Sequence, residues 1–272
     1  MTLPEVVSRA EWLAARKGLL AHEKALTRAT DALNAQRRQL PMVRVDVEYR
    51  FDGRRGPVTL LDLFAGRSQL AVYHFMFDPS WDAGCPGCTA VVDAMAPALG
   101  RHLGSRDTSL AIVSLAPLVK LDAYRVVRGW ELDWLSSYGT SFNVDFGVTI
   151  DAEAAPGTFD GVGADSEHVG RSGGAMNERV TRLKEISALS FFLRDGDDVF
   201  HTYTTYQRGT EGLISAYHLL DLSPLGRQEQ WELPAGRVAS PGPADPSFGG
   251  WGPGGPGAPS VEPPAAQCTC DD

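Results

Sequence analysis

The residues with the clearest chemical potential are Cys85 and Cys88, which flank a Pro-Gly dipeptide between an apolar run and a helical pattern. A cysteine just before a helix meets the unpaired N–H groups of the first turn and the positive end of the helix dipole, which both favour a thiolate. Pro86 suits the first helical position, where the N–H group that proline lacks would have no partner. We therefore expect Cys85 to be the N-cap of a helix and the more acidic thiol.

The spacing of the two cysteines predicts a redox cycle. Cys88 lies one turn into the expected helix and belongs to its apolar stripe, whereas Cys85 is expected at the exposed end of the turn. Cys85 would attack a substrate and Cys88 would resolve the mixed disulfide. The predicted function is a thiol-disulfide oxidoreductase without a cofactor. Its partners would be a protein or small-molecule thiol or disulfide and a cellular thiol reductant.

Metal binding is the first alternative. Two thiolates form half of a tetrahedral zinc site, and with an imidazole they suit a copper carrier. The histidines that would complete the site give the alternative ligand set Cys85, Cys88, His74 and His201. His74 alone, on an apolar strand, is better explained as a buried, hydrogen-bonded histidine.

Neighbouring residues in the same segment are also candidate site residues. Trp81 would cover the cysteine turn and exclude water, or simply pack against it. Asp82 would tune the thiolate, or lie as a solvated carboxylate in the loop. Together with His74, these residues are the candidate active-site neighbours.

The composition limits the partners and the compartment. Lys and Arg number 25 and Asp and Glu number 34, so the formal net charge is −9, which disfavours nucleic acid and anionic membranes as partners. The N-terminus lacks the pattern of a secretory signal, and no apolar run is long enough to span a bilayer. Only 4 cysteines occur, which is too few for a disulfide scaffold. We expect a cytoplasmic protein.

Residues 1–40 are expected to form an N-terminal helical extension. The segment 5–39 has no internal proline, and apolar residues recur every seven positions, at Trp12, Leu19, Leu26, Leu33 and Leu40. Such a helix packs against its own domain or against a second copy, which would give a homodimer. A second alternative function follows, a non-catalytic interaction protein in which this helix mediates assembly.

Residues 41–226 are expected to form an α/β domain with a central mixed sheet flanked by helices. Alternating residues predict a strand over 43–51, and the apolar run 69–77 predicts a central strand buried on both faces. Helical spacing covers 88–103 and 120–128, with a strand over 108–117 between them. The region 188–206 predicts a hairpin that turns at 195–197, and 211–222 predicts a closing helix.

Two segments are expected to lack regular structure. Residues 151–187 are rich in Gly, Ala and Asp and predict a long flexible insertion. Residues 234–272 are rich in Pro and Gly, which predicts a disordered tail. The tail ends in Cys268 and Cys270, a pair without an organising scaffold whose role stays open.

Several long blocks in order carry a resemblance to a known family. They include "EKALTRATDALNAQRRQLPMVRVDVEYRF", "VTLLDLFAGRSQLAVYHFMFDPSWDAGCPGCTAVVD" and "DVFHTYTTYQRGTEGLISAYHLLDLSP". Across residues 11–226 the chain resembles the bacterial domain of unknown function number 899 family, which is thioredoxin-like and related to alkyl hydroperoxide reductase and thiol-specific antioxidant proteins. The resemblance implies a thioredoxin-like fold with Cys85 and Cys88 at the start of a core helix, but no established reaction.

The chain departs from better-known thioredoxin-like proteins at three places. Thioredoxins carry Gly-Pro between their cysteines, whereas this turn has Pro86-Gly87. Asp82 stands where peroxiredoxins place a threonine, and a carboxylate there would repel a peroxide-activating thiolate. Ile186 and Ser187 stand where the fold usually has a cis-proline that blocks metal capture, which favours the metal alternative slightly.

Overall fold

The computed structural model describes residues 4–149, 185–229 and 232 of the 272-residue chain. The chain divides into an N-terminal unit that ends at Val43 and a second unit that begins at Arg44. Residues 151–184 of the expected insertion and the proline-rich tail, with Cys268 and Cys270, lie outside the described residues. The last residues of that insertion are not flexible as expected, because Glu185 and Ile186 are buried and Glu185 forms a bridge with Thr149. The domain boundaries expected from the sequence therefore stay a prediction.

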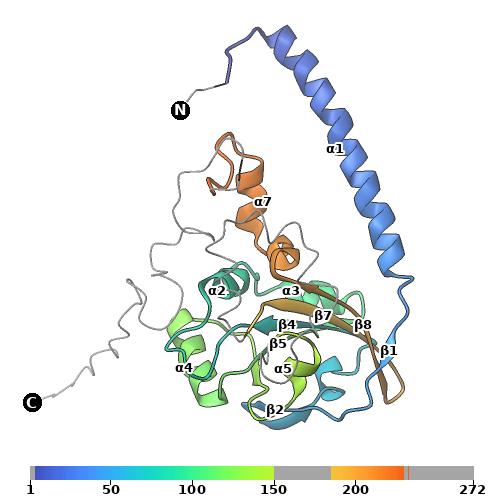
Figure 1. Ribbon diagram of the computed structural model, residues 1–272, viewed down its shortest axis with the longest axis vertical. Helices are drawn as coiled ribbons and strands as arrows, with labels where there is room; N and C mark the ends of the chain where they lie inside the picture. The colour runs from blue at the N-terminus through green and yellow to red at the C-terminus, as the bar shows by residue number, and fades with distance from the viewer. Residues whose placement is uncertain (1–3, 150–184, 230–231, 233–272) are drawn as a thin grey trace, which may run out of the picture. The chain divides into compact units, whose positions relative to one another are not determined.

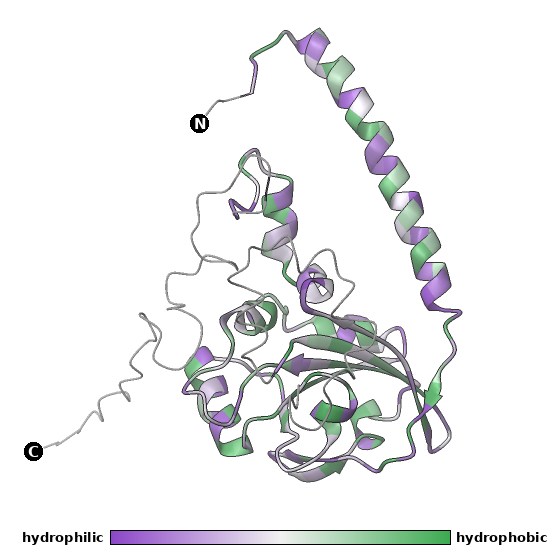
Figure 2. Cartoon of the chain, viewed as in Figure 1, coloured by the Kyte–Doolittle hydropathy of each residue, from purple (hydrophilic) through white to green (hydrophobic). Residues whose placement is uncertain are grey.

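The N-terminal unit contains a single long helix, α1 (Arg9–Arg37), which confirms the helix expected there. Ser8 begins it with a capping box, in which its hydroxyl accepts the Glu11 N–H and the Glu11 carboxylate accepts the Ser8 N–H. None of the helix residues is buried, and apolar and polar residues alternate along its whole length (Figure 2). Because no residue of the helix is buried, its own backbone hydrogen bonds and its N-terminal cap stabilise it.

An eight-stranded sheet forms the centre of the fold, in the order β1-β8-β7-β4-β5-β6-β2-β3. The strands are β1 (Val43–Arg44), β2 (Arg50–Gly53), β3 (Gly56–Thr59), β4 (Gln69–Phe75), β5 (Thr108–Ser114), β6 (Trp134–Ser136), β7 (Ala188–Asp195) and β8 (Asp198–Tyr206). Strands β4, β5 and β6 run parallel, whereas β7 pairs antiparallel with both β4 and β8. The sheet is mixed, as expected.

The order of strands and helices identifies the fold. After β4 come the helices α2 (Pro86–Asp93) and α3 (Leu99–Gly104), and then the parallel strand β5. After the β7–β8 hairpin come the short helix η2 (Gln207–Leu213) and the closing helix α7 (Ser215–Asp221). One β-α-β half and one β-β-α half therefore meet at β4 and β7. This is a thioredoxin-like arrangement, which confirms the expected fold class.

The two faces of the sheet hold different core clusters. On one face, Tyr73 and Phe75 of β4 pack with both cysteines, with α2 and α7, and with Leu121 of α4 (Leu118–Arg128). On the other face, the short helices η1 (Asp62–Phe64) and α5 (Phe142–Asp145) pack in one cluster with Phe51 of β2. Figure 1 shows α2 and α7 on one side of the sheet and α5 on the other.

The central elements match the sequence expectations. β4 is buried at every position after Gln69, β5 and α4 lie where predicted, and the hairpin turns between Asp195 and Asp198. The polar strand face and the Asp-Gly turn gave strong local signals for this hairpin.

The strand expected over 43–51 is wrong as a single element. The segment contributes β1 beside β8 and β2 beside β6, so its residues in between cross from one part of the sheet to another. The alternation correctly places Tyr49 and Phe51 in the core, but Val43 and Val47 of the same pattern are exposed. It does not predict a strand partner for each residue in between.

The helix expected over 88–103 is also interrupted. α2 ends at Asp93 and α3 begins at Leu99, with Pro97 in the irregular segment between them. Proline cannot donate the N–H group that a continuous helix needs, and its ring clashes with the preceding turn. Among the described residues, moreover, no helix is both long enough and apolar enough to cross a membrane.

Candidate active site at the start of α2

Cys85 occupies the N-cap position of α2 and Pro86 the first helical position, as the sequence predicts. The Cys85 N–H donates to the Met76 carbonyl at 2.9 Å, and the Cys85 carbonyl accepts the Thr89 N–H at 2.9 Å. The first bond ties the cysteine turn to the end of β4, and the second begins the helix. The cysteine therefore has a fixed backbone position between the central strand and the helix.

Both cysteines are buried free thiols, with 3% of Cys85 and 2% of Cys88 exposed. The expectation that Cys85 lies at the exposed end of the turn is therefore wrong. Directly before the turn, Gly84 lies close against β4, since a Cβ atom there would come within 2.5 Å of the Phe75 ring. Only glycine permits so close an approach of the loop to β4.

The two thiols differ in their ionisation. A hydrogen bond from the Cys88 thiol, aided by the backbone N–H groups of Cys88 and Gly87, lowers the pKa of Cys85 despite its burial. Burial raises the pKa of Cys88 well above its ordinary value, and the neighbouring Cys85 raises it further. Negative charge is thus favoured on Cys85, the N-cap residue.

Tyr73 of β4 lies beneath the cysteine pair. Its hydroxyl faces the Cys88 thiol closely enough to lower the pKa of that thiol, although burial has the larger, opposite effect. Among the described residues, the hydroxyl makes no hydrogen bond within normal geometric limits. Burial raises the pKa of Tyr73 well above its ordinary value, and the two nearby thiols raise it further. Tyr73 therefore acts here as a neutral polar neighbour of Cys88.

The loop from Asp78 to Gly84 is held by α4. The Lys120 ammonium group donates to the Pro79 carbonyl at 2.9 Å and to the Trp81 carbonyl, and it lies 5.3 Å from the centre of the Phe77 ring. Trp81 is half-buried and packs against the core cluster that contains both cysteines, while Asp82 is exposed. No sequence pattern pointed to Lys120, because its partners are backbone carbonyls.

A buried acid, Glu185, lies three residues before the start of β7 and is not among the predicted site residues. Its carboxylate accepts the Phe77 N–H at 2.8 Å and the Asn143 side-chain amide at 3.0 Å. Burial raises the pKa of Glu185 to about 7, and its charge raises the pKa of Cys85. A carboxylate directly before the apolar strand "ISALSFF" was the available signal.

The histidines lie on the other face of the sheet. Successive strand residues point to opposite faces, so His74 is directed away from Tyr73 and Phe75, and it stacks on Phe142 at 5.4 Å. A chain of hydrogen bonds runs from His74 through the hydroxyl groups of Ser190 and Thr204 to His201. His74 is buried and hydrogen-bonded, as the simpler of the two interpretations predicts.

This geometry contradicts the alternative metal site of Cys85, Cys88, His74 and His201. The cysteines belong to one core cluster, while the two histidines pack on aromatic rings of the other. Within residues 4–149, 185–229 and 232, no group of three or more His, Cys, Asp or Glu side chains is arranged to hold a metal ion. The ligand set was wrong because His74 and the cysteines are separated by the central strand itself.

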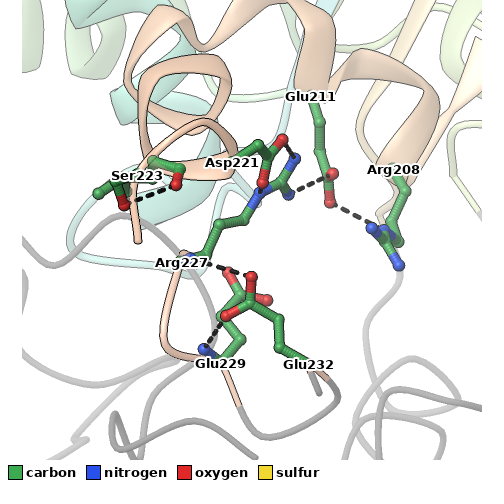
Figure 3. A network of polar contacts seen from close by, with 8 residues as sticks. Arg208, Glu211, Asp221, Ser223, Arg227, Glu229 and Glu232 are labelled. Atoms are coloured by element: carbon green, nitrogen blue, oxygen red, sulfur yellow. Dashed lines mark hydrogen bonds and ion pairs between the residues drawn. The ribbon is translucent and has the colours of Figure 1, made fainter. Parts of the chain in front are cut away.

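A network centred on Arg227 fixes the end of the described chain against α7 (Figure 3). The guanidinium group pairs with Asp221 at 2.6 Å and with Glu211 at 2.7 Å, and it lies 4.1 Å from the centre of the Tyr217 ring. Tyr217 belongs to the same core cluster as the cysteines. The network therefore ties the segment around Arg227 to α7 and η2.

Comparison with solved structures finds only distant similarity. The peroxidoxin BcpB from Mycobacterium tuberculosis is 15% identical, with a TM-score of 0.41 over 65% of this chain and 97% of that protein. Peroxiredoxin Q from Xanthomonas campestris is 14% identical, with a TM-score of 0.41 over 65% of this chain and 95% of that protein. A thioredoxin-like protein from Bacteroides caccae is 11% identical, with a TM-score of 0.31 over 70% of this chain and 56% of that protein.

Sequence comparison gives a clear family assignment. No curated protein matches the chain. A family model, by contrast, matches residues 1–242, which include both α1 and the cysteine turn. The chain belongs to the family described as bacterial protein of unknown function (DUF899).

Proposed function

We propose that this protein is a thiol-disulfide oxidoreductase that cycles between a Cys85–Cys88 disulfide and two free thiols. The observation that carries the proposal is the unequal pair at the start of α2. Cys85 has a lowered pKa at the N-cap, and Cys88 has a raised pKa one turn later. A nucleophile that is readily ionised and a resolving thiol that stays protonated suit this cycle.

The proposed exchange balances without a cofactor. The Cys85 thiolate attacks a substrate disulfide, a new bond forms between Cys85 and one substrate sulfur, and the other substrate sulfur leaves as a thiolate. Cys88 loses its proton and attacks Cys85, which forms the internal disulfide and releases the second substrate thiolate. Both released thiolates take up protons. A cellular thiol then reduces the internal disulfide and supplies the two electrons.

Access to Cys85 requires movement of the loop between Asp78 and Gly84. The sulfur is buried, and Lys120 holds the carbonyl groups of Pro79 and Trp81. A substrate disulfide must reach Cys85 along the axis of the bond it breaks, so the loop has to open first. We propose a protein or small-molecule disulfide in the cytoplasm as the substrate.

Disulfides suit this site better than peroxides. Asp82, in the position where peroxiredoxins carry a threonine, is an exposed carboxylate. A carboxylate cannot donate a hydrogen bond to a peroxide oxygen unless it is protonated, and its charge disfavours a nearby thiolate.

The test uses the full chain with Cys268→Ser and Cys270→Ser, so that only the pair at α2 reacts. Dithionitrobenzoate, a small aromatic disulfide, serves as the probe. With Cys88→Ser, Cys85 is expected to retain a stable mixed disulfide with one thionitrobenzoate group. With both cysteines present, Cys88 should release that group and leave the internal disulfide. Mass spectrometry of the intact protein distinguishes these products.

Cys85→Ser is the matched variant in this experiment. Its remaining thiol, Cys88, is buried and has a raised pKa, so it should react far more slowly. Equal reactivity of Cys85→Ser and Cys88→Ser, or a mixed disulfide that persists when both cysteines are present, would contradict the proposed roles.

A further inference from the structure

Glu185 is a buried charged group that the proposed exchange does not use. It is 2% exposed, and its partners are the Phe77 N–H, the Asn143 amide and, at 3.4 Å, the Thr149 hydroxyl. No Lys, Arg or His among the described residues forms an ion pair with it. A buried carboxylate supported only by neutral donors is unfavourable, so its presence beside the cysteine turn needs a reason.

One peptide group connects Glu185 to the cysteine turn. The carbonyl of the Met76–Phe77 peptide accepts the Cys85 N–H at 2.9 Å, and the N–H of the same peptide donates to Glu185 at 2.8 Å. A trans peptide directs its carbonyl and its N–H to opposite sides, so Glu185 and Cys85 hold this group from both sides. The carboxylate thereby fixes the carbonyl that positions Cys85 at the N-cap.

The same arrangement brings two acidic groups near each other. The charge of Glu185 raises the pKa of Cys85, and Asp78 in the cysteine loop raises the pKa of Glu185. Asn143 of α5 and Thr149, which face Glu185 from the other elements, are neutral. Among the residues that the structure describes, only neutral donors stabilise the carboxylate, so negative charges on Glu185 and Cys85 oppose each other.

We propose that Glu185 positions Cys85 through the Met76–Phe77 peptide and holds the proton that Cys85 gives up when it becomes a thiolate. The transfer balances as Cys85-SH plus Glu185-COO⁻ giving Cys85-S⁻ plus Glu185-COOH. When the thiolate forms a disulfide bond its charge is lost, and Glu185 returns its proton to a departing substrate thiolate. This role rests on the proposed exchange. Glu185 is a positioning residue, since it contacts neither substrate nor sulfur in the structure.

The test compares Glu185→Gln and Glu185→Asp with the parent, each with serine at positions 268 and 270. The rate at which iodoacetamide alkylates Cys85 is measured across the pH range in which thiols and carboxyls titrate. The parent is expected to show a broadened profile, because two coupled groups share the titration. Glu185→Gln should show a single step displaced to lower pH by roughly one unit, since the opposing charge is removed. Glu185→Asp keeps the charge and should keep the broadened profile.

Glu23→Gln on α1 is the matched control, because it removes an exposed carboxylate from the N-terminal unit. Its profile should coincide with that of the parent. A profile of Glu185→Gln that also coincides with the parent would overturn the inference.

A second measurement needs no variant at Glu185. In the parent labelled with carbon-13 glutamate, the Glu185 carboxyl resonance should titrate at higher pH in the dithiol form than in the disulfide form. Equal titration in both forms would contradict the proton exchange even if Glu185→Gln failed to fold. Failure of the proposed function looks different, because Cys85 and Cys88 would then form no reversible disulfide at all.

Discussion

At the scale of residues, the cysteine pair shows how position decides chemistry. Cys85 and Cys88 are equally buried, yet their pKa values move in opposite directions. Cys85 accepts from the Cys88 thiol and from the backbone N–H groups of Cys88 and Gly87, whereas burial and the neighbouring Cys85 dominate the pKa of Cys88. Burial alone would raise both pKa values. The hydrogen bond from the Cys88 thiol, together with the N–H groups at the helix start, lowers that of Cys85 and so separates the two.

His74 offers a residue-scale prediction of how stability depends on pH. Burial lowers the pKa of His74 to about 3, against 6.5 in an unfolded chain, so the folded protein holds the neutral form. Below pH 6.5 the unfolded chain binds a proton that the folded protein rejects, so this contribution to stability is lost as the pH falls. His74→Gln removes that loss while keeping a polar partner for Ser190.

The measurement is urea unfolding of the parent and of His74→Gln at neutral and at acidic pH. Relative to the variant, the parent should lose roughly 2 kcal/mol of unfolding free energy between about pH 7 and pH 5. The raised pKa of Glu185 changes stability with pH in the opposite direction. Because both proteins contain Glu185, its contribution cancels in the difference between their unfolding free energies. A difference that does not change with pH would contradict a neutral, buried His74.

At the scale of elements, the loop before α2 depends on one close approach. A Cβ atom on Gly84 would lie 2.5 Å from a carbon of the Phe75 ring, closer than packed atoms tolerate. Gly84→Ala should therefore reduce the unfolding free energy by roughly 1–3 kcal/mol. Gly18→Ala in α1 is the control, since nothing lies within 4 Å of its added Cβ and alanine favours a helix. Urea unfolding of both variants checks this, and equal stabilities would be inconsistent with the packed loop.

The same loop is expected to open when Lys120 is changed. Lys120→Met keeps an unbranched, apolar side chain but removes the donor for the Pro79 and Trp81 carbonyls. Exposure of Cys85 should increase, and its alkylation by iodoacetamide should become several-fold faster. Lys17→Met on α1 is the control and should alkylate at the parent rate. An unchanged rate in Lys120→Met would mean that the lysine does not hold the loop closed.

Local sequence patterns predict those elements that are determined by residues close to one another in the chain. The Cys85 cap, Pro86 at the first helical position, the buried strand β4 and the β7–β8 hairpin all follow from such patterns. What the patterns missed depends on tertiary contacts. Glu185 becomes significant only through the Phe77 N–H at the end of β4, and the loop before Cys85 is held by Lys120 of α4.

At the scale of the whole molecule, α1 is the element whose partner is still a prediction. It carries exposed apolar side chains at seven-residue intervals, including Leu19, Leu26 and Leu33, and none of its residues is buried. We expect a homodimer formed through this helix. Changing these three leucines to serine should shift the protein towards the monomer in sedimentation velocity experiments, without loss of the cysteine cycle. The same sedimentation coefficient before and after the change would contradict the dimer.

The whole molecule combines a thioredoxin-like sheet with the buried acid Glu185, a buried cysteine pair and a closing helix, α7, that pairs with Arg227. Because Cys85 is buried, its rate of reaction should depend on opening of the loop 78–84 as well as on the pKa of its thiol. This distinguishes the chain from an exposed redox pair, for which ionisation alone sets the rate.

The most direct test of the central claim is a redox titration of the full chain with Cys268→Ser and Cys270→Ser. The protein is equilibrated in buffers with an increasing ratio of oxidised to reduced dithiothreitol. Free thiols are then alkylated, and the intact mass gives the fraction of protein that contains the disulfide. A reversible two-electron transition that joins Cys85 to Cys88 is the predicted result. The absence of this disulfide in fully oxidising buffer, or a disulfide that cannot be reduced again, would contradict a thiol-disulfide oxidoreductase.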